Sequence, residues 1–239
     1  MPSAMTESRT HQVLVAFGAN LGDTAGMFRT VCRKMEEQPM VLAVRSSELF
    51  ETEPVGTVSP SGSYTNAVFA LTLDEEWTPD TLLRFLLEME RALGRQRQTH
   101  WESRCVDLDL LLFDDVEIHD FPQLVLPHPL MPWRRFVLEP AVQVAADWVH
   151  PGTGLSIAEL LRGLNRPEPR ILRLSMASPE EWEVADCVVN DTLADREDVR
   201  AWARSRHLPY IDCRDAFRGS ELPDCDLIVQ VIQNAYKTE

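Results

Sequence analysis

The apolar residues near the start of the chain predict a buried strand followed by an amphipathic helix. Residues 12–20 read QVLVAFGAN, a short apolar run closed by Gly and Asn, as expected of a strand inside a core. Asp23 is suited to cap the next helix, in which apolar residues recur at every fourth position from Met27 to Met35. Pro39 is expected to stop this helix.

Three further strands and a second helix follow. The stretches 40–52 and 64–73 are expected to be strands, and the second alternates well between the two faces of a sheet. The Thr-Pro pair at 78–79 is suited to open a helix that ends at Gly94, and the fourth strand is expected at 104–113. The order strand–helix–strand–strand–helix–strand predicts an α+β fold of the ferredoxin-like split βαβ type, an antiparallel sheet with helices packed on it.

The rest of the chain is expected to add two helical segments and a small α/β extension. A loop turns into a helix within 124–145, and a short helix is expected near 155–164. The stretch 165–170, NRPEPR, has two prolines and no apolar residue, and is the expected linker. The expected elements of the extension are strands at 186–190 and 208–212 and helices at 195–206 and 226–236. We therefore predict a domain at 11–166 and an extension of unknown role at 167–239.

Composition and charge argue against several classes of protein. In a chain of 239 residues, 44% hydrophobic, no apolar run approaches the ~20 residues of a membrane span, and the start lacks the pattern of a signal peptide. The five cysteines are scattered without a Cys-x-x-Cys pair, which favours reduced thiols in a cytoplasmic setting over disulfides or a zinc site. The net charge of −15 argues against a nucleic-acid partner.

Two aspartates in the fourth predicted strand are candidate metal ligands. Asp107 and Asp109 lie two positions apart and therefore share one face of a strand, with Cα atoms ~7 Å apart. That span allows two carboxylates to bracket two Mg²⁺ ions ~4 Å apart, as in two-metal phosphoryl-transfer sites. The alternative for an isolated Asp-x-Asp is a solvated acidic face. Arg95, Arg97 and Arg104 precede the pair in an otherwise acidic chain, and suit a polyphosphate ligand as well as ordinary surface ion pairs.

Other residues suit a flat heterocyclic ligand. Trp101 lies in a polar loop with no apolar stripe around it and offers a stacking surface, although it could equally cover the edge of a core. Tyr64 and Asn66 are two positions apart in a predicted strand and so share a face, where an aromatic ring and an amide together suit such a ligand. Tyr64 taken alone would be interpreted as a core residue. His128 stands between two prolines, for which a surface turn is the simpler interpretation.

A family resemblance is carried by six stretches in one order along the chain. They are FGANLGD (17–23), FETEPVG (50–56), YTNAVFAL (64–71), EMERALGRQR (88–97), HWESRCVDLDLLLFD (100–114) and LPHPLMPWRRFVLEP (126–140). In these the chain resembles the 6-hydroxymethyl-7,8-dihydropterin pyrophosphokinases of the folate pathway, over about two-thirds of its length. The resemblance implies transfer of the ATP β,γ-diphosphate to the pterin hydroxymethyl group, which yields AMP and the pterin diphosphate.

The same resemblance implies roles for individual residues. Asp107 and Asp109 match aspartates that hold two Mg²⁺ ions, and Arg95 and Arg104 match arginines that engage the triphosphate and act in the chemical step. Further ATP-binding positions implied are Glu90, Arg97, Trp101, Leu110, His128 and Arg134. Pterin-binding positions implied are Thr52, Pro54, Val55, Tyr64, Asn66, Trp101 and Phe136.

The chain also departs from the family pattern. Glu102 and Ser103 replace a usual Gly-Pro, and Gln98 and Gln123 stand where basic residues are frequent, so positive charge for ATP is reduced. Two alternatives to a single enzyme stay open: a pterin- or nucleotide-binding module without catalysis, and a bifunctional protein with a second activity in the extension. We expect a monomer or weak oligomer.

Overall fold

Strand β1 forms where the chain is most continuously apolar, and the rest of the sheet assembles around it. The computed structural model describes residues 9–52, 63–94, 106–120, 123–165, 171–174, 185–190, 192, 197–213, 228–229 and 232–233. The elements of the sheet and the helices after β1 and β4 are β1 (Thr10–Ala19), α1 (Thr24–Glu36), β2 (Val41–Ser46), β3 (Phe50–Thr52), β4 (Tyr64–Asp74), α2 (Pro79–Ala92) and β5 (Asp107–Phe113). The predicted helix caps are confirmed: Asp23 accepts a hydrogen bond from the Gly26 backbone N–H, and Thr78 caps α2.

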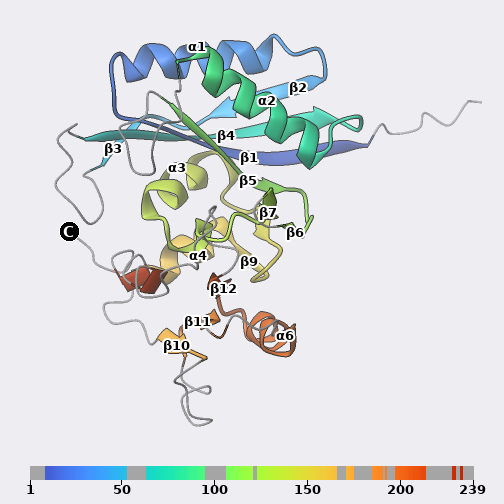
Figure 1. Ribbon diagram of the computed structural model, residues 1–239, viewed down its shortest axis with the longest axis vertical. Helices are drawn as coiled ribbons and strands as arrows, with labels where there is room; N and C mark the ends of the chain where they lie inside the picture. Colours follow the sequence, from blue (N-terminus) through green and yellow to red (C-terminus); the bar gives the residue numbers. More distant parts are fainter. Residues whose placement is uncertain are drawn as a thin grey trace, which may run out of the picture.

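The main sheet is antiparallel throughout and lies between two layers of helices. Its strand order is β2-β4-β1-β5, and β3 also pairs with β4. Helices α1 and α2 cover one face, and α3 (Arg135–Ala145) and α4 (Ile157–Gly163) lie on the other side (Figure 1). The predicted α+β class is therefore confirmed.

The alternation of side chains along the strands divides the apolar residues between two cores. Val13, Val15 and Phe17 of β1 face α1 and α2, whereas Leu14 and Ala16 face α3. The residues that continue the α3-side core are Leu130, Met131, Trp133, Val137, Leu138, Ala141, Ile157 and Leu160. Burial of both faces explains the nearly continuous apolar character of the central strands.

A β-bulge in β5 sets which of its side chains face each core. Leu14 pairs with Leu112 and Val15 with Leu110, so Leu111 is the extra residue. Leu111 and Leu112 consequently both enter the α3-side core, while Leu108 and Leu110 enter the α1–α2 core. Side chains of β5 before the bulge thus alternate between the two faces of the sheet, and the bulge shifts this alternation for the residues after it.

Several details differ from the sequence-based expectations. The single strand expected at 40–52 is two strands, because Ser47 is buried and its hydroxyl accepts a hydrogen bond from the Val68 N–H at 3.0 Å, between β2 and β3. The expected strand at 104–113 begins at Asp107, and residues 104–105 lie outside the described part of the chain. Short elements not predicted from the sequence are β6 (Ile118–Asp120), β7 (Leu124–Leu126), η1 (Met131–Trp133), β8 (Val149–His150) and β9 (Leu155–Ser156).

The extension contains a second, parallel sheet in the order β10-β11-β12. Its elements are β10 (Ile171–Arg173), β11 (Cys187–Asn190), α6 (Glu197–Ser205) and β12 (Tyr210–Asp212). The strands at 186–190 and 208–212 and the helix at 195–206 agree with expectation, whereas β10 was not predicted. Parallel pairing of β11 and β12 around α6 is a βαβ unit.

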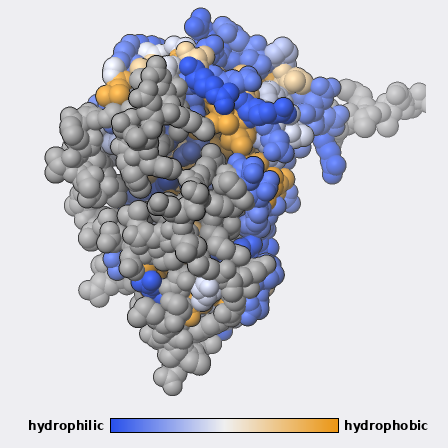
Figure 2. Space-filling view, in the orientation of Figure 1, coloured by the Kyte–Doolittle hydropathy of each residue, from blue (hydrophilic) through white to orange (hydrophobic). Residues whose placement is uncertain are grey.

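Among the described residues, none of the helices is both long and apolar enough to cross a membrane. Where Figure 2 shows described residues over the α1–α2 end of the molecule, the surface is mainly hydrophilic with small hydrophobic areas.

Candidate active site

Strand β5 places the two predicted metal ligands on the α3 side of the sheet. Asp107 pairs with Gly18 and Asp109 with Ala16, and both carboxylates are partly exposed while Leu108 between them is buried. Ala16 belongs to the α3-side core, so Asp109, opposite it in an antiparallel pair, shares that face. The expectation that Asp107 and Asp109 share a face is therefore confirmed.

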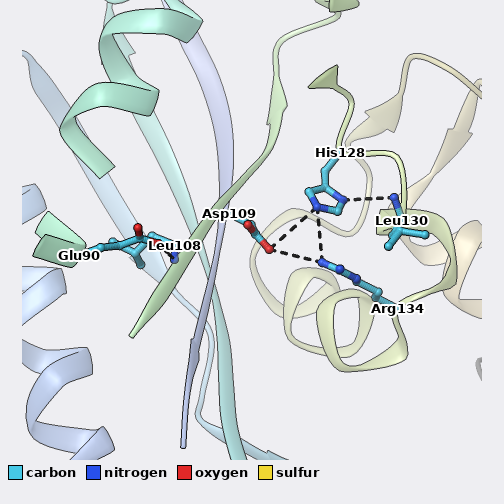
Figure 3. A network of polar contacts seen from close by, with 6 residues as sticks. All are labelled: Glu90, Leu108, Asp109, His128, Leu130 and Arg134. Atoms are coloured by element: carbon cyan, nitrogen blue, oxygen red, sulfur yellow. Dashed lines mark hydrogen bonds and ion pairs between the residues drawn. The ribbon is translucent and has the colours of Figure 1, made fainter. Parts of the chain in front are cut away.

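Asp109 lies at the centre of a polar network. Its Oδ2 is 3.3 Å from Arg134 Nη1 and 3.9 Å from His128 Nε2, and its side chain is 29% exposed. Figure 3 shows the carboxylate pointing toward both residues, which follow β7 in the chain. His128 and Arg134, which are 19 and 25 residues from Asp109 in the sequence, thus lie close to its carboxylate.

The backbone around η1 determines where His128 and Arg134 lie. The His128 N–H donates to the Leu111 carbonyl at 2.9 Å, which ties this segment to the bulged strand β5. The Leu130 N–H donates to His128 Nδ1 at 3.2 Å, and His128 Nε2 lies 3.5 Å from Arg134 Nη1 on the Asp109 side. The Arg134 N–H donates to the Met131 carbonyl, and Arg134 directly precedes α3.

Three of the predicted pterin residues, Thr52, Tyr64 and Asn66, lie on the same sheet face. Asn66 pairs with Gly18 across β4 and β1, and its Nδ2 donates to Thr52 Oγ1 at 2.7 Å. Thr52 pairs with Tyr64, so these side chains share the face that carries Asp107. Gly18 lies between Asn66 and Asp107 in register, and a Cβ at this position would lie 3.6 Å from Asn66 Oδ1. The register of β1 is what identifies Gly18, which the sequence reasoning missed.

Helix α3 brings an aromatic residue to the same face. It packs against β4 and β3, and Phe136 in its first turn is partly buried against the α3-side core. The Arg134 guanidinium lies 5.7 Å from the centre of the Phe136 ring, within cation–π range. An aromatic ring, a guanidinium, an imidazole and an amide thus lie on the same side of the sheet as the two carboxylates.

Two predicted ATP-binding residues lie on the opposite side of the sheet. Glu90 of α2 is 2% exposed, and its Oε1 accepts a hydrogen bond from the Leu108 N–H at 2.8 Å. The Leu110 side chain is buried in the α1–α2 core. A contribution from Leu110 to ATP binding is therefore restricted to its main chain, because its side chain faces away from Asp109.

Other predicted site residues lie outside the described part of the chain: Arg95, Arg97, Trp101, Arg104, Pro54 and Val55. Within the ranges that the structure describes, no three or more His, Cys, Asp or Glu side chains gather as a metal cage. A pair of carboxylates nevertheless matches Mg²⁺, which is commonly held by one or two carboxylates and completes its coordination with waters and substrate phosphates.

Comparison with known proteins gives consistent matches. The family profile described as 7,8-dihydro-6-hydroxymethylpterin-pyrophosphokinase matches residues 14–146. The 2-amino-4-hydroxy-6-hydroxymethyldihydropteridine pyrophosphokinase of Methylorubrum extorquens is 35% identical over 138 residues, covering 58% of this chain and 85% of that protein. The enzyme of the same name from Bacillus subtilis is 33% identical over 130 residues, covering 54% and 75%.

Solved structures extend the likeness to the fold. A crystal structure of Plasmodium falciparum HPPK-DHPS superposes with a TM-score of 0.50 at 11% identity, covering 84% of this chain and 62% of that one.

Proposed function

The chain belongs to the 7,8-dihydro-6-hydroxymethylpterin-pyrophosphokinase family and is an ATP-dependent diphosphotransferase of folate biosynthesis, and we propose that the α3-side face of its main sheet is the active site. The observation that carries this assignment is the convergence of Asp107, Asp109, His128 and Arg134 with Asn66 and Tyr64 on one sheet face. Substrates are ATP and 6-hydroxymethyl-7,8-dihydropterin.

The reaction requires alignment and charge neutralisation more than covalent catalysis. The pterin hydroxymethyl oxygen forms a bond to the ATP β-phosphorus, the bond from that phosphorus to the α,β-bridging oxygen breaks, and AMP leaves with the electron pair. The hydroxyl proton is released. A side chain that holds the phosphates in line lowers the barrier, because charge shifts onto the leaving oxygen in the transition state. Arg134 is placed for this role beside Asp109.

Asp107 and Asp109 would hold two Mg²⁺ ions. Their shared strand face, partial exposure and all-oxygen chemistry support this assignment. Bound Mg²⁺ would supply charge neutralisation on the polyphosphate. The Arg134 guanidinium lies next to the Asp109 carboxylate, so its positive charge is available there to a phosphate oxygen of ATP.

Tyr64, Asn66, Thr52 and Phe136 would form the pterin pocket. Asn66 donates one amide hydrogen to Thr52, which fixes the amide plane and orients its carbonyl oxygen. Phe136 and Tyr64 supply aromatic surfaces for a flat ring. The predicted roles of Arg95, Arg97, Trp101 and Arg104, and of Pro54 and Val55, belong to the same proposal, and these residues lie outside the described part of the chain.

Further assignments belong to the same proposal. The antiparallel strand order β2-β4-β1-β5, with α1 after β1 and α2 after β4 in the chain, supports the ferredoxin-like split βαβ arrangement for residues 11–166. Residues 167–239 are proposed to be an appended α/β unit. The free thiols of the described cysteines, Cys32, Cys187 and Cys213, are in keeping with a cytoplasmic protein. We propose, as expected from the sequence, a monomer or weak oligomer.

A coupled assay for AMP tests the proposal. Production of AMP should require the pterin, ATP and Mg²⁺ together, and omission of any one should abolish it. ATP hydrolysis to ADP, or AMP formation independent of the pterin, would contradict the assigned reaction. Binding of both substrates without turnover would instead support the non-catalytic alternative.

A further inference from the structure

Both faces of the small parallel sheet in the extension are apolar. One of these faces belongs to the hydrophobic core of the catalytic part of the chain. Val188 on β11 faces α6, where it packs in one cluster with Val199 and Ala203. Cys187 and Val189, on either side of Val188, point the opposite way and belong to the α3-side core. The extension therefore shares its hydrophobic interior with the sheet that carries Asp109.

This shared core includes η1, and the residues proposed to bind the ATP polyphosphate, His128 and Arg134, flank η1. Trp133 of η1 is 1% exposed and lies in the same cluster as Cys187. Cys187 is fully buried in this core, and burial raises the pKa of its thiol to about 12. Trp133 Nε1 is buried without a hydrogen-bond partner within the described residues. Trp133 immediately precedes Arg134.

Polar contacts fasten the extension to the catalytic part at other points. Arg204 of α6 pairs with Glu117, just before β6, and Arg200 Nη1 lies 2.7 Å from Nε2 of His119 in β6. His207 Nδ1 lies 3.1 Å from the Thr153 carbonyl. These contacts join α6 and the turn that follows it to the hairpins β6–β7 and β8–β9, and hairpin β6–β7 leads directly into the His128 segment. Figure 1 shows β11 and β12 beneath α4 on this side of the molecule.

We propose that the C-terminal extension is a positioning element for the nucleotide side of the active site, acting through the apolar core that β11 shares with η1. The proposal rests on the function assigned above. Met131, Pro132 and Trp133 are all buried, so η1 cannot shift without disturbing the core that the extension completes. His128 and Arg134 flank η1 and converge on Asp109, so the support given by β11 is transmitted to the carboxylate. Cys187 is a positioning residue and touches no substrate.

Two neighbouring residues of β11 give a matched test in the full-length protein. Cys187→Leu enlarges a fully buried side chain on the η1 face, and Val188→Phe enlarges a fully buried side chain on the α6 face. We expect Cys187→Leu to raise both the KM for ATP and the Kd of a non-hydrolysable ATP analogue by about three- to tenfold, with the KM for the pterin unchanged. Val188→Phe should lower the melting temperature with both KM values retained.

Milder variants keep the test decisive if either large residue prevents folding. Cys187→Ala and Val188→Ala shorten the same two side chains, and only the first should weaken the ATP analogue. The proposal is overturned if a folded Cys187 variant binds the analogue as the wild type does, or if the Val188 variant weakens it equally. Failure of the wild type to form AMP would contradict the assigned function, whereas an active wild type with unaffected Cys187 variants would contradict only the role of the extension.

Discussion

Glu90 accepts a hydrogen bond from the backbone N–H of Leu108 at 2.8 Å, and this contact joins helix α2 to the strand that carries both aspartates. Leu108 lies between Asp107 and Asp109, and β5 is at one edge of the main sheet among the described residues. The carboxylate therefore satisfies a buried donor on the free side of β5 and restrains the start of that strand. An acidic residue with 2% exposure thus has a structural reason to be there.

Glu90→Ala should reduce both stability and turnover. Removal of the acceptor leaves a buried N–H without its partner, at a cost of about 1–3 kcal/mol in the free energy of unfolding. Glu90→Gln keeps an acceptor oxygen and should restore most of both properties, whereas direct recognition of a ligand through the negative charge would not be restored. Chemical denaturation and the AMP assay measure the two effects. Glu88→Ala, exposed on the same helix, is the control and should change neither.

Asp107→Asn and Asp109→Asn should abolish most turnover while leaving the fold intact. Both side chains are partly exposed and contribute little to the core, but each substitution removes a negatively charged metal ligand. We expect a loss of roughly a hundredfold or more in kcat at saturating Mg²⁺. Asp115→Asn, just beyond the end of β5 and exposed, is the matched control. Near-normal activity in either site variant, with unchanged melting temperature, would exclude the metal assignment.

Arg134→Lys and Tyr64→Ala should separate the two substrates. Lysine retains the charge but loses the planar donor pair and the stacking on Phe136, so the KM for ATP should rise by about tenfold. Tyr64→Ala removes an aromatic surface of the proposed pterin pocket and should raise the KM for the pterin instead. Steady-state kinetics with each substrate varied will distinguish them. The same kinetic defect in both variants would show that the face is not divided in this way.

The protein should become less stable as the pH is lowered, because of His150. Burial lowers the pKa of this imidazole from 6.5 to about 4, so the unfolded chain takes up a proton between these values that the native state does not. The stability contributed by neutral His150 is present above pH 6.5 and is lost as pH falls toward 4. At pH 5 the loss is about 2 kcal/mol.

Urea denaturation at pH 7 and pH 5 measures this loss. His150→Gln removes the titrating group, so its free energy of unfolding should depend less on pH in this window, even if the variant is less stable at pH 7. An unchanged difference between the two pH values in His150→Gln would assign the pH dependence to other groups.

The local geometry of the catalytic part could be predicted from sequence, because periodicity depends only on neighbouring residues. Strand β1, helices α1 and α2 and their caps agree with expectation. The shared face of Asp107 and Asp109 follows from the two-residue repeat of a strand. Motifs in order along the chain identified the family, and with it the reaction.

Only the tertiary structure brought distant residues together. Strand pairing placed Asn66 beside Gly18 and Gly18 beside Asp107, and the extra residue at Leu111 decided which leucines of β5 enter each core. Packing of η1 brought Arg134 to Asp109, and β11 placed Cys187 in the same hydrophobic cluster as Trp133. Sequence periodicity specifies which way a side chain points within its own element. Its partner depends on register and on the burial of both faces of a sheet, which are properties of the whole folded chain.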